Sequence, residues 1–213
     1  MRSVLCYGDS NTWGAATVTR PDDRYASDER WPGVLRAELG ADWLVIEEGL
    51  GGRTTLTDDP VEGADKNGRT YLLPCLRSHR PLDVVAIMLG TNDLKARFNK
   101  SAWEIAQGVG VLVDIVKAAG VGRGGGTPEI VVVCPAVVLD RLPLHGDMFA
   151  GAPAKSRDLA MHYAAVAAER AVRFLDAGAV IKSSAHDGFH LDPEAHLALG
   201  RAVVAEIGGM DLK

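Results

Sequence analysis

Cysteine is scarce in this chain: only Cys6, Cys75 and Cys134 occur among 213 residues. An odd number of widely spaced cysteines does not make a disulfide framework, so the fold must rest on a packed core. Unpaired thiols are typical of reducing compartments, and we expect a cytoplasmic protein. Cys6 and Cys134 lie within apolar runs, where we expect them to be small buried side chains.

Long apolar runs are also missing. No stretch approaches the roughly 20 apolar residues that a membrane-spanning helix requires. Residues 2–9 hold one arginine, a short apolar run and then Asp9. That run is too short for the apolar region of a signal peptide. We therefore expect no association with a membrane.

Basic residues are outnumbered: 23 Lys and Arg stand against 28 Asp and Glu, a formal net charge of −5. Nucleic-acid binding needs a basic surface, so we expect no nucleic-acid partner. The glycine-rich segment 122–126 lacks the Gly-Lys-Ser/Thr ending of a phosphate-binding loop and is expected to be a flexible surface loop. A small neutral or weakly polar substrate fits this composition best.

Strand-like and helical patterns alternate along one expected domain, residues 1–213. Apolar runs predict strands at 3–8, 44–46, 83–89, 130–134 and 173–175. Helical periodicity and capping signals predict helices at 31–40, 71–79, 101–120, 158–171 and from 193 onward. This alternation predicts the α/β class: a three-layer α/β/α sandwich around a mostly parallel five-stranded sheet. Residues 136–156 show little periodicity and are expected to be a long loop, a wall or a lid of the site.

The segment 8–14, of sequence GDSNTWG, follows the first predicted strand directly. A strand that ends in a tight turn would place Ser10 at the carboxyl edge of the sheet, where open α/β folds bind ligands. If a helix begins just beyond the turn, backbone N–H groups near Ser10 face an arriving negative charge, which suits a serine nucleophile whose attack forms an oxyanion. On this segment alone, an ordinary strand-to-turn junction is an equally good interpretation.

Three more polar segments supply what a serine nucleophile needs; they lie at residues 51–52, 90–93 and 187–190. Because parallel strands share one carboxyl edge, we expect these segments to meet there. His190 is the expected general base, and Asp187 is expected to orient its ring. The expected oxyanion donors are the N–H groups of Ser10 and Gly52 and the side chain of Asn92.

These blocks, in this order, resemble the SGNH hydrolases, also called GDSL-like esterases. The longer runs at 8–14, 47–50 and 88–93 are similar to the arylesterase/acyltransferase branch, which includes perhydrolases. The resemblance implies a flavodoxin-like SGNH fold and hydrolysis of short acyl esters, such as aryl esters or acetylated carbohydrates. It also implies a compact homo-oligomer, for example an octamer.

The residues expected to line the substrate pocket are Asn11, Trp13, Lys95, Met148, Phe149 and Phe189. Asn11 stands where the family commonly has leucine. His186 and His190 are four residues apart, but a glycine lies between them and no acid-rich ligand set accompanies them, so we expect no metal and no cofactor. The other histidines, His79 among them, are expected to be packing or surface residues, and Glu47-Glu48 a solvated strand end.

The leading hypothesis is a serine esterase that acts through an acyl-Ser10 intermediate. An alternative in the same class is an acyltransferase or perhydrolase that passes the acyl group to alcohols or peroxide. A more distant alternative is a non-catalytic flavodoxin-like binding module, which would not need Asp187 and His190. A classical α/β-hydrolase is disfavoured, because segment 8–14 lacks the second glycine of the nucleophile elbow.

Overall fold

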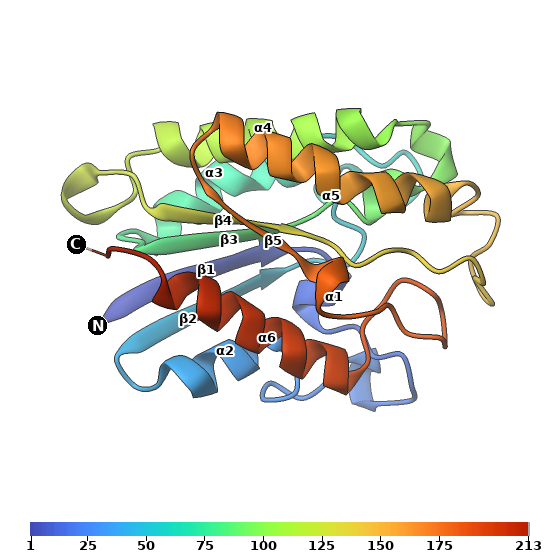
Figure 1. Ribbon diagram of the computed structural model, residues 1–213, viewed down its shortest axis with the longest axis horizontal. Coiled ribbons are helices and arrows are strands. Elements are labelled where there is room, and N and C mark those ends of the chain that lie inside the picture. The colour runs from blue at the N-terminus through green and yellow to red at the C-terminus, as the bar shows by residue number, and fades with distance from the viewer. Residues whose placement is uncertain (213) are drawn as a thin grey trace.

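Five strands form a central sheet in residues 1–212, the part of the chain that the computed structural model describes (Figure 1). They are β1 (Arg2–Gly8), β2 (Trp43–Gly49), β3 (Val84–Met88), β4 (Glu129–Cys134) and β5 (Arg173–Asp176). Their order across the sheet is β2-β1-β3-β4-β5, and each adjacent pair is parallel. All five carboxyl ends therefore lie at one edge of the sheet.

Side chains of the central strands alternate between two cores. In β1, Leu5 and Tyr7 face one apolar cluster, whereas Val4 and Cys6 face the other, and all four are fully buried. A strand that is covered on both faces has a continuous apolar sequence. This is why the central strands can be predicted from the sequence.

Two helical layers enclose the sheet (Figure 1). One layer consists of α3 (Gly68–His79), α4 (Ala102–Ala118) and α5 (Ala152–Glu169); the other consists of α2 (Trp31–Leu39) and α6 (Pro193–Gly208). Val109 and Tyr163 are buried in the first core, and Trp31 and Val203 in the second. The predicted three-layer α/β/α sandwich is confirmed.

In the sequence, Ser101 and Glu104 have the spacing of a capping box, and Asp192 precedes a first-turn proline as a candidate N-cap. The structure gives these two predictions different outcomes. At the start of α4, Ser101 Oγ accepts from the N–H of Glu104 at 3.2 Å, and the Glu104 carboxylate accepts from the N–H of Ser101 at 2.8 Å. This is the predicted capping box. Asp192 does precede α6, but its side chain accepts from the Thr17 hydroxyl at 2.5 Å and does not cap the helix.

The predicted start of α5 is wrong. The helix begins at Ala152, six residues before the predicted Asp158, so the irregular segment after β4 is shorter than expected. Gly151 occupies the N-cap position and Pro153 lies in the first turn. Both residue types favour loops as well as helix starts, and the sequence alone does not separate these two roles.

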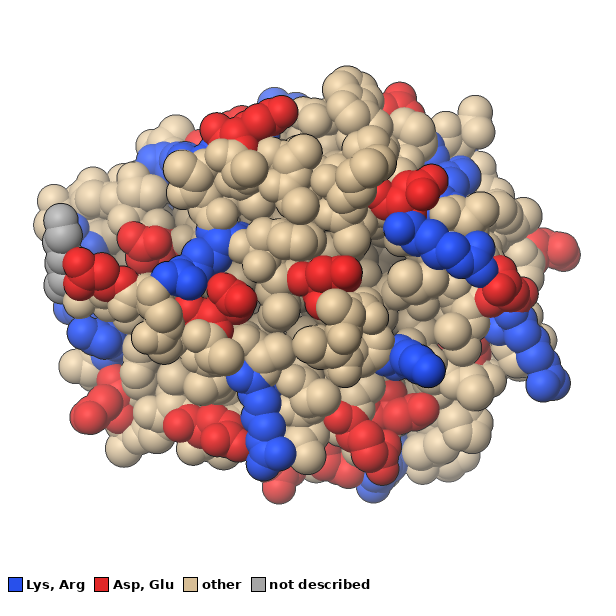
Figure 2. All heavy atoms as spheres, viewed as in Figure 1, with Lys and Arg blue, Asp and Glu red and all other residues tan. Residues whose placement is uncertain are grey.

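Charged side chains of both signs are interspersed over the face shown in Figure 2. Ion pairs join neighbouring helices: Arg201 of α6 lies 3.0 Å from Glu38 of α2, and Arg170 lies 3.0 Å from Asp114 of α4. Exposed pairs of this kind contribute about 0–1 kcal/mol each. Among residues 1–212, no helix combines the length and the apolar character that crossing a membrane requires.

Candidate active site

Ser10 begins a single helical turn at the carboxyl end of β1. This turn is α1 (Ser10–Trp13), and Asp9 caps it by accepting from the N–H of Asn11 at 2.9 Å. Ser10 itself is only half-buried and lines a cavity. The junction predicted from the sequence thus presents the serine hydroxyl to an open space.

Asp187 and His190 lie in the connection between β5 and α6, which makes a tight turn at residues 187–190. Asp187 Oδ1 accepts from the backbone N–H groups of Phe189 and His190, each at 3.0 Å. Gly188 has φ +95°, a conformation that side-chain-bearing residues rarely adopt, so glycine lets the chain fold back on itself. The turn holds the carboxylate next to the imidazole.

Three side chains form one hydrogen-bonded series. Asp187 Oδ2 lies 2.7 Å from His190 Nδ1, and His190 Nε2 lies 2.9 Å from Ser10 Oγ. Burial alone would raise the pKa of Asp187, but the hydrogen bond and charge of His190 outweigh it, so this pKa lies below its usual value. The ionised carboxylate favours a proton on Nδ1, which leaves Nε2 free to accept the Ser10 proton.

Two other strand ends bring hydrogen-bond donors to the same cavity. Gly52 follows β2 and Asn92 follows β3, and both line the cavity. The Asn92 side chain is fixed by donating from Nδ2 to the Arg53 carbonyl at 3.2 Å. Gly52 has φ +79°, and a Cβ there would collide with the Glu62 carboxylate, so only glycine fits without rearrangement.

The cavity that holds these groups has a volume of about 260 Å³. Its wall includes five of the six residues predicted to line a pocket: Trp13, Lys95, Met148, Phe149 and Phe189. The rings of Phe149 and Phe189 pack with centroids 4.7 Å apart, and the Phe189 ring lies 4.3 Å from that of His190. The wall beside the imidazole is therefore apolar.

Asn11, the sixth predicted pocket residue, lies elsewhere. Its side chain is 4% exposed, and Nδ2 donates to the Phe189 carbonyl at 3.1 Å. It is not part of the cavity wall. The structure corrects this prediction: Asn11 ties α1 to the turn that carries His190, because an amide can hydrogen-bond a backbone carbonyl where leucine cannot.

Glu62 and His145 line the cavity although the sequence did not single them out for the site. Glu62 forms ion pairs with buried Lys95 and, at 2.5 Å, with Arg97. Burial would raise the pKa of Glu62, but hydrogen bonds from these two cations lower it. The His145 ring lies edge-on to Phe189, with centroids 5.6 Å apart. Both residues come from irregular loops, where no periodic pattern signals which side chains face inward.

Two buried carboxylates support the site. Asp93 accepts from the Thr55 N–H at 2.8 Å and from its hydroxyl at 2.7 Å, and it pairs with Lys100 at 2.8 Å. Full burial raises the pKa of Asp9 to about 6, although the hydrogen bond from the Asn11 N–H opposes this shift. Both carboxylates therefore hold the backbone around the cavity in place.

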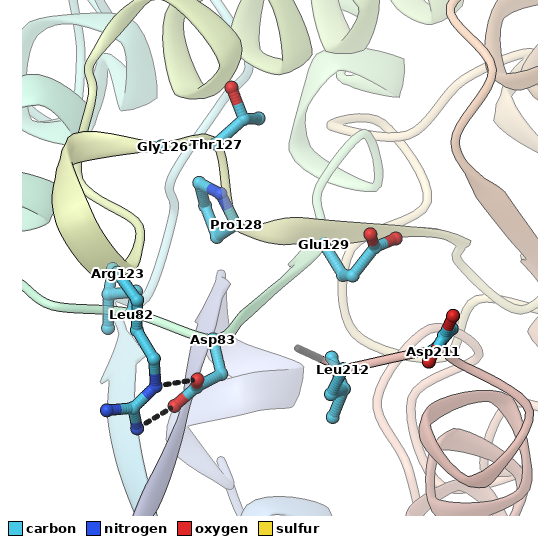
Figure 3. Close-up of a pocket in the computed structure, with 9 residues that line it drawn as sticks. All are labelled: Leu82, Asp83, Arg123, Gly126, Thr127, Pro128, Glu129, Asp211 and Leu212. Atoms are coloured by element: carbon cyan, nitrogen blue, oxygen red, sulfur yellow. Dashed lines mark hydrogen bonds and ion pairs between the residues drawn. The ribbon is translucent and has the colours of Figure 1, made fainter.

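Another hollow lies at the amino-terminal edge of the sheet (Figure 3). Two of its charged residues are paired with each other: Arg123 binds the Asp83 carboxylate through Nε at 2.5 Å and Nη2 at 2.9 Å. Asp83 also accepts from the backbone N–H of Ser3 at 2.7 Å. These contacts hold the start of β1 and the segment before β4, so the pair has a structural role.

Comparisons with known proteins agree with this arrangement. Residues 6–198 match the model of the GDSL-like lipase/acylhydrolase family. A carbohydrate acetylesterase from Sinorhizobium meliloti, Est24, has 42% sequence identity and a TM-score of 0.91, with 98% of this chain and 99% of that chain covered. An aryl esterase from M. smegmatis gives the same values. For a putative arylesterase from Agrobacterium tumefaciens, identity is 40% and the TM-score 0.88, with both chains fully covered.

A comparison with curated proteins gave no significant match. The fold and the solved relatives define the class of this protein: it is a carboxylic ester hydrolase. The chain belongs to the GDSL-like lipase/acylhydrolase family, as the sequence blocks predicted. The alternative of a non-catalytic binding module is thereby set aside.

Proposed function

We propose that this hydrolase cleaves short-chain acyl esters, such as aryl acetates or acetylated carbohydrates, through a covalent acyl-Ser10 intermediate. The observation that carries the proposal is the series Ser10 Oγ, His190 Nε2 and Nδ1, and Asp187 Oδ2, with spacings of 2.9 and 2.7 Å, at the wall of the cavity. A hydroxyl is a weak nucleophile at neutral pH and needs an adjacent base of this kind.

In the first step, Ser10 Oγ attacks the ester carbonyl carbon while His190 Nε2 takes the hydroxyl proton. The carbonyl π electrons move to the oxygen and form a tetrahedral oxyanion. This intermediate collapses, the bond to the alcohol oxygen breaks, and His190 returns the proton to the leaving alcohol. The ionised Asp187 stabilises the imidazolium that exists between the two proton transfers.

In the second step, His190 Nε2 takes a proton from a water molecule while the water oxygen attacks the acyl carbon. The second tetrahedral intermediate then collapses, the Ser10–acyl bond breaks, and His190 returns the proton to Ser10 Oγ as the free acid leaves. The oxyanion of both steps is proposed to bind the N–H groups of Ser10 and Gly52 and the Asn92 side chain. Loss of one such donor typically lowers kcat by about 10²–10³-fold.

The preference for a short acyl group is supported by the cavity. Its volume of about 260 Å³ leaves little room for a long chain, and Met148, Phe149 and Phe189 bound it with apolar surface. Glu62 and Lys95 add a polar region that suits hydroxyls of the alcohol part. The esterase names of the relatives favour water as the acyl acceptor, so acyl transfer is not proposed as the main reaction.

We also propose a cytoplasmic homo-oligomer. The free buried thiols of Cys6, Cys75 and Cys134 support a reducing compartment. Large apolar side chains that remain exposed, Leu144 at 72% and Met161 at 66%, support contacts between copies. Light scattering on a size-exclusion column tests the assembly, and a monomer at micromolar concentration would contradict it.

Hydrolysis of a chromogenic phenyl ester series, from acetate to octanoate, tests the proposed reaction. We expect kcat/KM to be highest for acetate and to fall by at least about 10⁴-fold in Ser10→Ala. Ser78→Ala, which changes an exposed serine of α3, is the matched control and should keep full activity. A folded Ser10→Ala variant that still hydrolyses acetate would refute the role of Ser10.

A further inference from the structure

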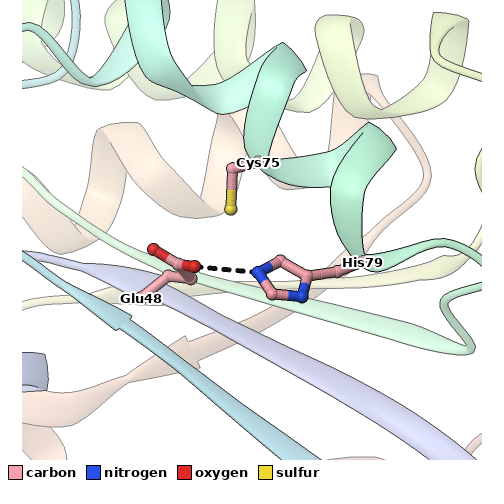
Figure 4. Close-up of side chains that lie close together, drawn as sticks. All are labelled: Glu48, Cys75 and His79. Atoms are coloured by element: carbon pink, nitrogen blue, oxygen red, sulfur yellow. Dashed lines mark hydrogen bonds and ion pairs between the residues drawn. The ribbon is translucent and has the colours of Figure 1, made fainter.

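A second group of reactive side chains lies between the end of β2 and α3. Glu48 is near the end of β2, and Cys75 and His79 are on α3. One ligand-type atom from each of the three lies within 4.8 Å of the other two. Figure 4 shows the carboxylate, the thiol and the imidazole converging, with His79 Nε2 2.9 Å from Glu48 Oε1.

The fold creates this convergence. Residues four apart on a helix lie on the same face, so Cys75 and His79 both point to one side of α3. That side faces the end of β2, where Glu48 completes the group. Ligands of a tetrahedral zinc ion lie about 2.0–2.3 Å from the metal and therefore roughly 3–4 Å from one another. The observed spacing needs only small side-chain movements to reach that geometry.

We propose that Glu48, Cys75 and His79 bind a zinc-type divalent cation. A thiolate and an imidazole select borderline or soft cations over Mg²⁺ and Ca²⁺, which prefer oxygen ligands alone. On binding, the Cys75 thiol loses its proton to solvent and the metal–sulfur bond forms, with no change of oxidation state. The expectation that no metal binds was based on His186 and His190 alone. Glu48 is distant from α3 in the sequence, so the sequence did not indicate that it lies beside Cys75 and His79.

The cation has a route to this site. Cys75 is fully buried, but the side chains of His79 and Glu48 are 31% and 19% exposed. Glu48 also borders a surface hollow together with Tyr71 and Pro74. Because His79 and Glu48 are partly exposed, solvent can supply a fourth ligand to the three protein ligands.

One nearby charge opposes the cation. The Arg53 guanidinium lies 5.5 Å from the centre of the Tyr71 ring and lines the same hollow as Glu48. It is held in place by donating to the carbonyl oxygens of Gly8 and Glu48. The carboxylate and the thiolate outweigh this single positive charge, so we expect binding that is weaker than at sites with four protein ligands.

Titration with Co²⁺ tests the proposal independently of esterase activity. Cobalt bound to a thiolate has a sulfur-to-metal charge-transfer band, which a cation at the His190 imidazole would lack. We expect one Co²⁺ per chain with this band, displacement of the cobalt by Zn²⁺, and a rise in the thermal unfolding midpoint with Zn²⁺. Cys134→Ala, which removes a thiol buried in β4, is the matched control and should keep the band.

Cys75→Ala should abolish the charge-transfer band, and circular dichroism shows whether this variant folds. His79→Gln changes a partly exposed residue, so it should fold, and it should weaken Co²⁺ binding by about tenfold or more because the imidazole ligand is gone. The proposal is overturned if wild-type protein shows no band at millimolar Co²⁺. It is equally overturned if the band persists in Cys75→Ala or if His79→Gln binds Co²⁺ as well as the wild type.

Discussion

Replacing Asp187 by asparagine should inactivate the enzyme while leaving its fold intact. The backbone N–H groups of Phe189 and His190 both donate to Oδ1, so they require an oxygen at that position. The amide nitrogen of the variant must then occupy the Oδ2 position, 2.7 Å from His190 Nδ1. Two donors cannot face each other, so the ring proton moves to Nε2, which can no longer accept the Ser10 proton.

Loss of the correct tautomer in such a series lowers kcat by about 10⁴-fold, or about 5 kcal/mol in the barrier. Asp187→Ala is a useful second variant, because it also leaves the backbone N–H groups of Phe189 and His190 without an acceptor. We expect it to lower the free energy of unfolding by about 2–4 kcal/mol, whereas Asp187→Asn should lower it by about 1 kcal/mol or less.

Phenyl acetate hydrolysis and urea unfolding, measured on both variants, separate these effects. Activity of Asp187→Asn within tenfold of the wild type would show that the carboxylate does not control the imidazole. Equal stability of the two variants would show that the backbone hydrogen bonds at Oδ1 contribute little.

Asn92, Met148 and Asp9 each give a further test of the site. Asn92→Ala should lower kcat by about 10²–10³-fold with little change in KM, because the proposed donor would stabilise only the oxyanion; a change in KM alone would assign Asn92 to substrate binding. Met148→Ala should raise kcat/KM for the phenyl butyrate ester relative to kcat/KM for the phenyl acetate ester. An unchanged ratio would show that the acyl group does not lie against Met148. Burial raises the pKa of Asp9 from 3.8 to about 6, so the folded protein holds a proton that the unfolded chain releases. Titration of Asp9 should therefore lower the free energy of unfolding by about 2 kcal/mol between pH 4 and pH 7, while His196, whose pKa burial lowers to about 4, contributes a rise over part of the same range. The Asp9 contribution is therefore measured in urea titrations as the difference between the wild type and Asp9→Asn, and a difference that does not change with pH would contradict the assignment.

The sheet and the blocks of the candidate site could be predicted from sequence because their signals are local. β1 and β3 are buried on both faces and have continuous apolar sequences, and each is followed directly by a polar block. Parallel strands bring their carboxyl ends to one edge, so Ser10, Asn92 and His190 could be expected to meet without any knowledge of distances.

The rest of the site depends on contacts between distant segments. Glu62 reaches the cavity because Lys95 and Arg97 hold it there, and neither partner is near it in sequence. Asn11 turns away from the cavity because the Phe189 carbonyl offers it an acceptor. Cys75 looks like an isolated cysteine until the fold brings Glu48 beside α3.

Trapping of the acyl-enzyme is a direct test of the proposed covalent intermediate on Ser10. Wild-type protein is mixed with p-nitrophenyl acetate, quenched in acid within the first turnovers, digested and examined by mass spectrometry. We predict one acetyl group on the peptide that contains Ser10, and none on the corresponding peptide of Ser10→Ala. An acetyl group on another residue would contradict the proposed mechanism. So would Ser10 that stays unmodified while the wild type hydrolyses the ester rapidly, under conditions in which deacylation is rate-limiting.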